Sequence, residues 1–324
     1  METQGKTAIN NACPVCGNAS KRFGKHRNGL QRFRCLSCKK TFTEDHKRGF
    51  RVEDYLNEKI GLAAIGMLVE GCSIRSVERL TGIRRDSLIQ LLLIAGERCE
   101  RRMDSIRNVR AYEVEADEIW GYVGKKERNK RPEEFDNDSL GDCWCWCALE
   151  ARTKLMLAFT VGRRTLENAM DLTNKLRYAT STEPFQLTTD GNQSYLYAVD
   201  AHLADRVHFA QLIKYYNQPQ LTETRYSPAE IVEAIPVVIS GNPDPAKICT
   251  SHVERQNLTM RMQIRRLTRL TNAFSKKVES HRAAIALHFA HYNWCRIHGS
   301  LRVTPAMEAG ITDRVWTLAE LLNF

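Results

Sequence analysis

Apolar residues change their spacing along the chain, and these changes divide it into segments of different predicted structure. Between about residue 55 and residue 100 they recur at helical intervals. From Ala111 they form short strand-like runs, AYEVEADEIW, CWCWCALE and LMLAFTV. A helical stretch follows from about Thr165, the run FQLTT ends at Asp190, and helical spacing dominates again after Ser251. Strands followed by helices in this order predict an α/β domain that begins near residue 110.

Two segments lack such a pattern. Residues 1–50 are rich in Lys, Arg, Gly and Cys, with few aliphatic residues, so a hydrophobic core alone would not fold them. Residues 217–250 hold five prolines, which predicts a loop-rich connection. We therefore expect four parts, at residues 1–50, 51–108, 109–300 and 301–324.

The helical segment contains a break that predicts short helices joined by a turn. One helix spans residues 59–70 and ends at Gly71, and Ser73 can cap a second helix that runs to about Leu80. After the turn Thr81-Gly82-Ile83, a third helix is expected, with Leu88, Leu92 and Ala95 facing inward.

Two short helices joined by a glycine-containing turn are typical of the DNA-binding helix-turn-helix. The outward residues that could reach a major groove are Arg84, Arg85, Ser87 and Gln90. An ordinary helical bundle is the alternative interpretation.

Four of the eleven cysteines are regularly spaced. Cys13-Pro-Val-Cys16 and Cys35-Leu-Ser-Cys38 form the pattern C-x2-C-x18-C-x2-C, which predicts a tetrahedral zinc site. The ion would fold residues 1–50, and the many basic residues there favour DNA contact, with protein contact as the alternative. The other cysteines do not suggest a disulfide framework. Cys143, Cys145 and Cys147 alternate with tryptophans, which a strand with one thiol face explains more simply than a metal site.

The formal net charge of +10 over 324 residues is unevenly distributed. Residues 1–110 carry 22 Lys/Arg against 12 Asp/Glu, residues 111–250 carry 15 against 21, and residues 251–324 carry 11 against 5. Basic segments attract phosphate backbones, whereas an acidic middle suits carboxylate sites for divalent cations. The chain contains no run of 18 apolar residues that would predict a membrane span, and its N-terminus lacks a secretory signal. We therefore expect a soluble, cytoplasmic, nucleoid-associated protein.

Three acids occupy positions that suit catalysis. Asp117 lies in an alternating run, and Asp190 ends an apolar run just before Gly191. Glu254 opens the basic segment HVERQNLTMRMQIRRL, where one helix would align it with Arg261 and Arg265. Each acid alone could equally be a solvated or structural group, because the chain has 38 of them.

Several motifs together carry a family resemblance that covers nearly the whole chain. The run DEIWGYVGKK, from Asp117 to Lys126, resembles the first-aspartate motif of transposases of the insertion-sequence-one type. Thr189-Asp190-Gly191 is similar to their second-aspartate motif. The segment HVERQNL at residues 252–258, with Arg261 and Phe274-Ser275-Lys276, resembles their glutamate motif. The segment YNWCRIH at residues 292–298, with Thr304-Pro305-Ala306, resembles the common ending of related transposases.

The resemblance implies an RNase H-like α/β catalytic domain preceded by the zinc-binding module and the helix-turn-helix. It implies a catalytic triad with Asp117 on a central strand, Asp190 at the end of an adjacent strand and Glu254 on a helix. Such an enzyme cleaves double-stranded DNA at element ends and joins it to target DNA, with Mg²⁺ or Mn²⁺ held by the three carboxylates. Synapsis of two ends implies a homo-oligomer, at least a dimer.

Further residues are weaker candidates. Phosphate contacts are expected from Lys125, Lys126, Arg255, Asn257, Arg261, Arg265 and Arg266. Glu118 is expected on the opposite strand face from Asp117, and His208 and His252 could approach the site. Two other functions stay open, namely a DNA-binding regulator derived from a transposase and a metal-dependent nuclease without strand transfer.

Overall fold

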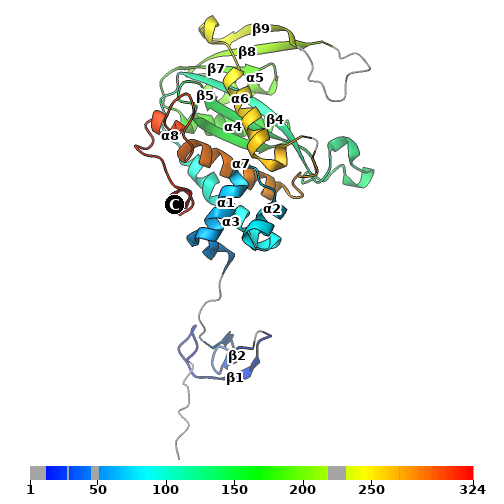
Figure 1. The fold of residues 1–324 in the computed structure, drawn as a ribbon, viewed down its shortest axis with the longest axis vertical. Helices are drawn as coiled ribbons and strands as arrows, with labels where there is room; N and C mark the ends of the chain where they lie inside the picture. The colour runs from blue at the N-terminus through cyan, green and yellow to red at the C-terminus, as the bar shows by residue number, and fades with distance from the viewer. Residues whose placement is uncertain (1–11, 28, 45–50, 218–230, 270, 324) are drawn as a thin grey trace, which may run out of the picture. The chain divides into compact units, whose positions relative to one another are not determined.

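The computed structural model describes residues 12–27, 29–44, 51–217, 231–269 and 271–323. It divides into two compact units, Met1–Arg51 and Val52–Phe324 (Figure 1). Within these residues, no helix is long and apolar enough to cross a membrane.

The first unit is a small antiparallel sheet of three strands. Its strands are β1 (Ser20–Lys25), β2 (Gln31–Cys35) and β3 (Thr41–Thr43). Phe33 pairs with Phe42 across β2 and β3, and their rings stack 5.8 Å apart. Cys13 and Cys16 precede β1, whereas Cys35 ends β2 and Cys38 follows it.

The second unit begins with helices that agree with the predicted spacing. They are η1 (Val52–Asn57), α1 (Lys59–Val69), α2 (Ile74–Thr81) and α3 (Arg85–Asp104). The Ser73 side chain accepts a hydrogen bond from the Ser76 backbone N–H, which caps α2 as predicted. Gly82 ends α2 with a φ of 73°, a conformation that glycine adopts readily.

A six-stranded mixed sheet forms the centre of this unit. Its order is β6-β5-β4-β7-β8-β9, with β4–β7 and β7–β8 parallel and the other pairs antiparallel. The strands are β4 (Glu113–Val123), β5 (Gly141–Glu150), β6 (Met156–Gly162), β7 (Phe185–Asp190), β8 (Val207–Tyr216) and β9 (Ile231–Ser240). The prediction of an α/β arrangement is confirmed.

Helices cover both faces of the sheet (Figure 1). Trp146 packs edge-on against Tyr195, whereas the Sγ of the adjacent Cys147 lies 3.8 Å from Asn257 Oδ1. Because neighbouring strand residues point to opposite faces, the helices that carry Tyr195 and Asn257 lie on opposite sides. The helices are α4 (Leu166–Ala179), α5 (Ser194–Leu203), α6 (Ser251–Gln263) and α7 (Val278–Trp294), followed by the short α8 (Pro305–Glu308) and α9 (Leu318–Leu322).

One hydrophobic core joins the helical segment, the sheet and the C-terminal residues. α3 approaches α7 so closely at Gly96 that an added Cβ would lie 2.4 Å from Ala283 Cβ. In the C-terminal segment, Trp316 packs on Trp294 and Leu322 is fully buried. The division of Val52–Phe324 into separate DNA-binding, catalytic and tail parts stays a prediction.

Two predictions about elements were wrong. Residues 217–250 are not loop-rich throughout, because Ile231–Ser240 forms β9, while Pro219 and Pro228 lie outside the described residues. Pro236 is tolerated there because β9 is the last strand of the sheet. α6 ends at Gln263, so Arg265 falls in the 3-10 turn Arg265–Leu267 and does not share a helical stripe with Glu254.

Candidate active site

The two predicted aspartates lie side by side on the central strands. β4 and β7 run parallel with Ala116 opposite Thr189, which brings the following residues, Asp117 and Asp190, to the same level. Carboxylate oxygens of Asp117, Glu118 and Asp190 all lie within 4.8 Å of one another. These three residues are called the acidic cluster below.

Glu118 belongs to the cluster, although its side chain was expected on the opposite face of the strand from that of Asp117. Asp190 is the last residue of β7, and its carboxylate lies near those of both Asp117 and Glu118. The Arg164 guanidinium bridges Glu118 at 3.3 Å and Asp190 at 3.2 Å, and Asn192 Nδ2 donates to Glu118 at 2.7 Å. Sequence analysis had no signal for Glu118 beyond its position next to Asp117.

Burial and mutual repulsion favour the protonated forms of these carboxyls. Desolvation, followed by the charge of Asp190, raises the pKa of Asp117 to about 6 and that of Glu118 to about 7. Desolvation also raises the pKa of Asp190. Closely spaced, partly buried oxygen donors of this kind could hold a divalent metal ion, whose charge would offset their repulsion.

Glu254 lies outside the acidic cluster within the described structure. It is in the first turn of α6, where its carboxylate contacts the Lys214 ammonium and accepts a hydrogen bond from Thr250 Oγ1 at 2.6 Å. The Lys214 charge also lowers the pKa of Asp117 and Asp190, although burial outweighs it. Lys214, on β8, thus connects Glu254 electrostatically to the two aspartates, and sequence analysis missed it.

Asn257 contacts the acidic cluster directly. Its Nδ2 donates to Asp117 Oδ2 at 2.7 Å, a contact that sequence analysis did not predict. The predicted contact of Asn257 with DNA phosphates stays a prediction. The position three residues after Glu254 was a usable signal, because residues three apart share a helix face.

Glu115 fixes the start of α6 against β4. Its buried carboxylate accepts hydrogen bonds from the backbone N–H of His252 at 2.8 Å and of Val253 at 2.9 Å. His252 Nδ1 lies 2.6 Å and Cys249 Sγ 3.2 Å from the other oxygen. His252 is therefore held by Glu115, and His208 accepts from the Asn242 backbone. Alternation along β4 places Glu115 and Asp117 on one face, a signal that sequence analysis did not use.

The residues predicted to contact DNA, in its major groove or at its phosphates, fall into two groups. Arg84, Gln90, Arg255 and Arg265 are exposed, and Arg85 is exposed beside Asp86. The other predicted cations also contact the chain itself, and their contact with phosphates stays a prediction. Arg261 donates to the backbone oxygens of Leu267 and Trp120, Arg266 to Ser275 Oγ, Lys125 pairs with Glu134, and Lys126 lies 5.4 Å from the centroid of the Trp120 ring.

The four regularly spaced cysteines converge in the first unit. Cys13, Cys16, Cys35 and Cys38 place their Sγ atoms within 4.8 Å of one another, with 3.6 Å between Cys13 and Cys38 and 3.5 Å between Cys16 and Cys35. A zinc tetrahedron with 2.3 Å bonds would separate its sulfurs by about 3.8 Å, so the spacing fits. A hydrogen bond from the Cys38 backbone lowers the pKa of Cys35 to about 6, which favours the thiolate.

The other three alternating cysteines are core residues. Cys143, Cys145 and Cys147 are buried on β5, and burial raises the pKa of each thiol. The interpretation as a strand with a thiol face is confirmed.

Fold and site together define a mixed α/β protein that carries one cysteine cluster and one carboxylate cluster, each able to hold a metal ion. The IS1 transposase family model matches residues 243–294, the segment that includes Glu254 and Asn257. The chain is 30% identical to the insertion element iso-IS1n protein InsB of Shigella dysenteriae over 173 residues, which are 53% of this chain and 88% of that protein. It is 27% identical to the IS1 protein InsB of Shigella sonnei over 184 residues, 55% of this chain and 96% of that protein. The chain belongs to the IS1 transposase family.

A solved structure of a piggyBac transposase synaptic complex with hairpin DNA gives a weaker likeness. It has a TM-score of 0.37 and 12% identity, and the match covers 85% of this chain and 70% of that one. This likeness is too low to establish a shared fold.

Proposed function

We propose that this protein is an insertion-sequence transposase that cleaves DNA at the ends of its element and transfers the strand to target DNA. The observation that carries the proposal is the acidic cluster, in which Asp117 and Asp190 lie side by side on parallel central strands. Membership of the IS1 transposase family supports it independently.

The sheet order also supports an RNase H-like interpretation of this domain. A three-stranded antiparallel meander, β4 to β6, is followed by β7 and β8, which lie parallel on the other side of β4. Asp117 is then on the central strand and Asp190 at the end of its parallel neighbour, as the family resemblance implies.

The acidic side chains would perform the chemistry with divalent cations, Mg²⁺ or Mn²⁺, at their oxygens. Such ions, when bound, stabilise the attacking and leaving oxygens of a phosphodiester. Asn257 orients Asp117, and Arg164 holds Asp190 next to Glu118. We propose that Glu254 completes the triad. Lys214 pairs with the Glu254 carboxylate, and its positive charge also lowers the pKa of Asp117 and of Asp190.

The N-terminal cysteines and helices would supply recognition of the element ends. We propose that Cys13, Cys16, Cys35 and Cys38 bind a structural zinc ion and that α2 and α3 form a helix-turn-helix. The exposed Arg84 and Gln90 at and after the start of α3 support a role in groove contact. A protomer that synapses two DNA ends would act with at least one further copy.

The test is the single variant Asp117→Asn, because an amide cannot replace the charge of a metal-binding carboxylate. We expect loss of cleavage and of strand transfer with Mg²⁺ or Mn²⁺, on duplex DNA that carries the element ends, while binding of that DNA persists. Glu167→Gln, an exposed acid in the first turn of α4, is the matched control and should act like wild type.

The outcomes separate the competing functions. Wild-type cleavage by Asp117→Asn would remove the acidic cluster from the mechanism. Cleavage by the wild-type protein without joined products would instead identify a nuclease, and DNA binding without any cleavage a regulator.

A further inference from the structure

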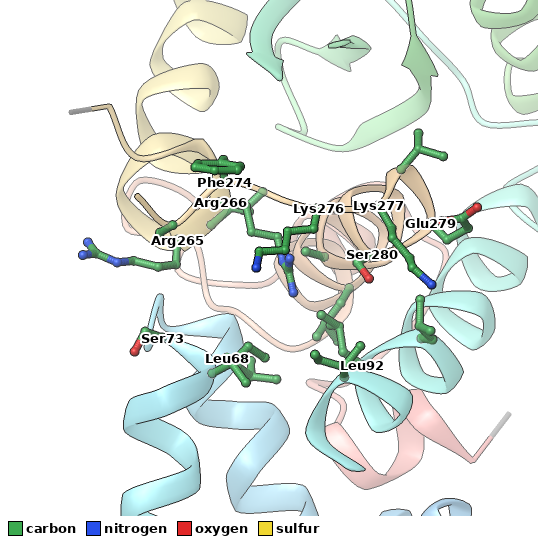
Figure 2. A pocket seen from close by; sticks show the side chains of 18 of the residues that line it. Leu68, Ser73, Leu92, Arg265, Arg266, Phe274, Lys276, Lys277, Glu279 and Ser280 are labelled. Carbon is green, nitrogen blue, oxygen red and sulfur yellow. The ribbon is translucent and has the colours of Figure 1, made fainter. Parts of the chain in front are cut away.

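A deep cleft separates the helices α1 to α3 from the connection between α6 and α7. Its volume is about 1400 Å³, and both walls belong to the unit Val52–Phe324. Leu68 and Leu92 contribute to an apolar wall on the helical side, and the opposite wall is formed by segments between Gln263 and His288 (Figure 2). The cleft lies outside the acidic cluster, because none of the three acids lines it.

The lining of the cleft is strongly cationic. Six Lys or Arg side chains line it against two acids, and one of these acids, Asp86, pairs with Arg85. The other five cations form no ion pair among the residues that the structure describes. They are Arg75, Arg265, Arg266, Lys276 and Lys277. Elsewhere in this unit cations commonly have acidic partners, as in Arg98–Glu53 at 2.8 Å and Arg177–Asp205 at 2.7 Å.

Arg266 is the most informative of these cations. Its side chain is half-buried, so desolvation lowers its pKa, yet its hydrogen bond goes to the neutral Ser275 Oγ at 3.3 Å. A cation that is partly withdrawn from water and has no carboxylate nearby is stabilised when an anion pairs with it. In Figure 2 the side chains of Arg266, Lys276 and Lys277 extend from the α6–α7 connection toward the helices that carry Leu68 and Leu92. An anion that pairs with Arg266 would therefore enter through the cleft.

The cleft is also joined to the strand that carries Asp117. Ser275 forms a parallel bridge with Val123 at the end of β4, and the Phe274 ring lies 5.0 Å from that of Tyr122. Tyr122 in turn lies 5.7 Å from Trp120, so a series of aromatic rings follows β4 into the cleft wall. Aromatic rings beside unpaired cations are typical of surfaces that bind a nucleic-acid strand.

We propose that this cleft binds a DNA strand, with its phosphates on Arg265, Arg266, Lys276 and Lys277 and the strand continuing along β4 toward the acidic cluster. The inference rests on the proposed function for the identity of the anion. A row of unpaired cations over an apolar wall matches a chain of phosphates that carries flat, weakly polar bases.

The test compares two double variants of the full-length protein in binding to one labelled oligonucleotide, single-stranded or as a duplex, without divalent metal. Lys276→Gln with Lys277→Gln removes two exposed cations from the cleft. Arg107→Gln with Arg302→Gln removes two exposed cations that do not line it. Each lost phosphate contact should flatten the plot of log affinity against log salt by about 0.7 to 0.9.

We therefore expect the cleft variant to lose at least ~10-fold in affinity for single-stranded DNA at low salt, with a slope shallower by about 1 to 2. The control should keep the wild-type slope. Cys72 lines the cleft, so bound DNA should also slow its alkylation, whereas Cys295, which does not line it, should react at an unchanged rate. Equal slopes for the two double variants would overturn the proposal.

Two further outcomes also count against it. If polyglutamate of matched charge competed as well as DNA, the cleft would be a site for an acidic protein segment. If the cleft variant lost affinity for the duplex alone, the single-strand assignment would be wrong. Asp117→Asn separates this inference from the proposed function, because that variant should bind DNA in the cleft normally. Normal cleavage by Asp117→Asn would reject the catalytic proposal without touching the binding result.

Discussion

At the scale of single residues, the carboxylates of the acidic cluster repel one another, and nearby cations offset part of this repulsion. Three carboxyls whose oxygens lie within 4.8 Å of one another repel when ionised, and burial adds to that cost. Arg164 and Lys214 offset part of it, since both positive charges lower the pKa of Asp117 and Asp190. The pKa values of all three carboxyls are still raised, so a cation that binds there at mildly acidic pH would displace protons from them.

The first prediction concerns the pH dependence of metal binding and of stability. A carboxyl whose pKa is higher in the folded state stabilises the fold fully below its unfolded pKa, and that contribution is lost as pH rises through the folded pKa. For Asp117, with an ordinary value of 3.8 and a folded value of about 6, and for Glu118, at about 7, the window lies between about pH 4 and pH 7. A bound divalent cation offsets this loss only where the carboxyls are ionised.

We therefore expect Mn²⁺ to raise the melting temperature more at about pH 8 than at about pH 5. Differential scanning calorimetry of the full chain with and without Mn²⁺ measures this. Asp117→Asn should largely remove the pH-dependent part of the increase. A Mn²⁺ effect of equal size at both pH values would show that these carboxyls do not bind the ion.

The sequence indicated some members of the site and could not indicate others. Asp117 and Asp190 stand in recognisable motifs at strand positions. Lys214 and Glu254 are 40 residues apart, and their contact depends on how β8 packs beside α6. Glu118 lies near Asp190 at the end of β7, a proximity that strand alternation along β4 does not reveal.

At the scale of elements, α6 is placed by a carboxylate from the strand beneath it. Glu115 accepts the backbone N–H groups of His252 and Val253, which are among the free donors of the first helical turn. A negative charge at this end of a helix is also favourable in the field of the helix dipole. Glu115 therefore sets the position of Glu254 and Asn257 relative to Asp117.

The second prediction is that Glu115→Gln loosens α6. Gln keeps one acceptor oxygen for the two backbone N–H groups, but it removes the negative charge at the start of the helix, and its amide group replaces the oxygen that faces His252 Nδ1 and Cys249 Sγ. We expect a loss of about 1 to 3 kcal/mol in the free energy of unfolding. Amide hydrogen exchange should accelerate in Ser251–Gln263 more than in β4. Glu167→Gln should change the stability by less than about 0.5 kcal/mol, and an equal effect of both variants would contradict the capping role.

Periodicity predicted most elements, and its failures have local causes. The strands β4 to β7 and the helices α1 to α4 follow their apolar spacing closely. β9 was missed because prolines outweighed its run of Ile and Val, although Pro236 is compatible with a strand at the sheet edge. The end of α6 was placed too late because apolar spacing continues through Ile264 and Leu267, which pack into the core from outside the helix.

At the scale of the whole molecule, the two units differ in what can hold them together. Val52–Phe324 has an extensive core that runs from the helices through the sheet to Leu322. Among the described residues of Met1–Arg51, the buried hydrophobic side chains are Cys13, Phe33 and Cys35. Burying one large apolar side chain contributes about 1.5 to 3 kcal/mol, whereas ordering the backbone costs about 1 to 2 kcal/mol for each residue.

The third prediction follows from this difference. If zinc at the four cysteines supplies the missing free energy, its removal should unfold the first unit alone. We expect a chelator, or Cys35→Ser, to abolish the protection of amides in β2 against hydrogen exchange, while those in β4 stay protected. Cys72→Ser, a half-buried cysteine outside the cluster, should leave both sets unchanged. Protection of β2 that survives complete metal removal would show that the small sheet is stable without an ion. Its cysteines would then need another explanation.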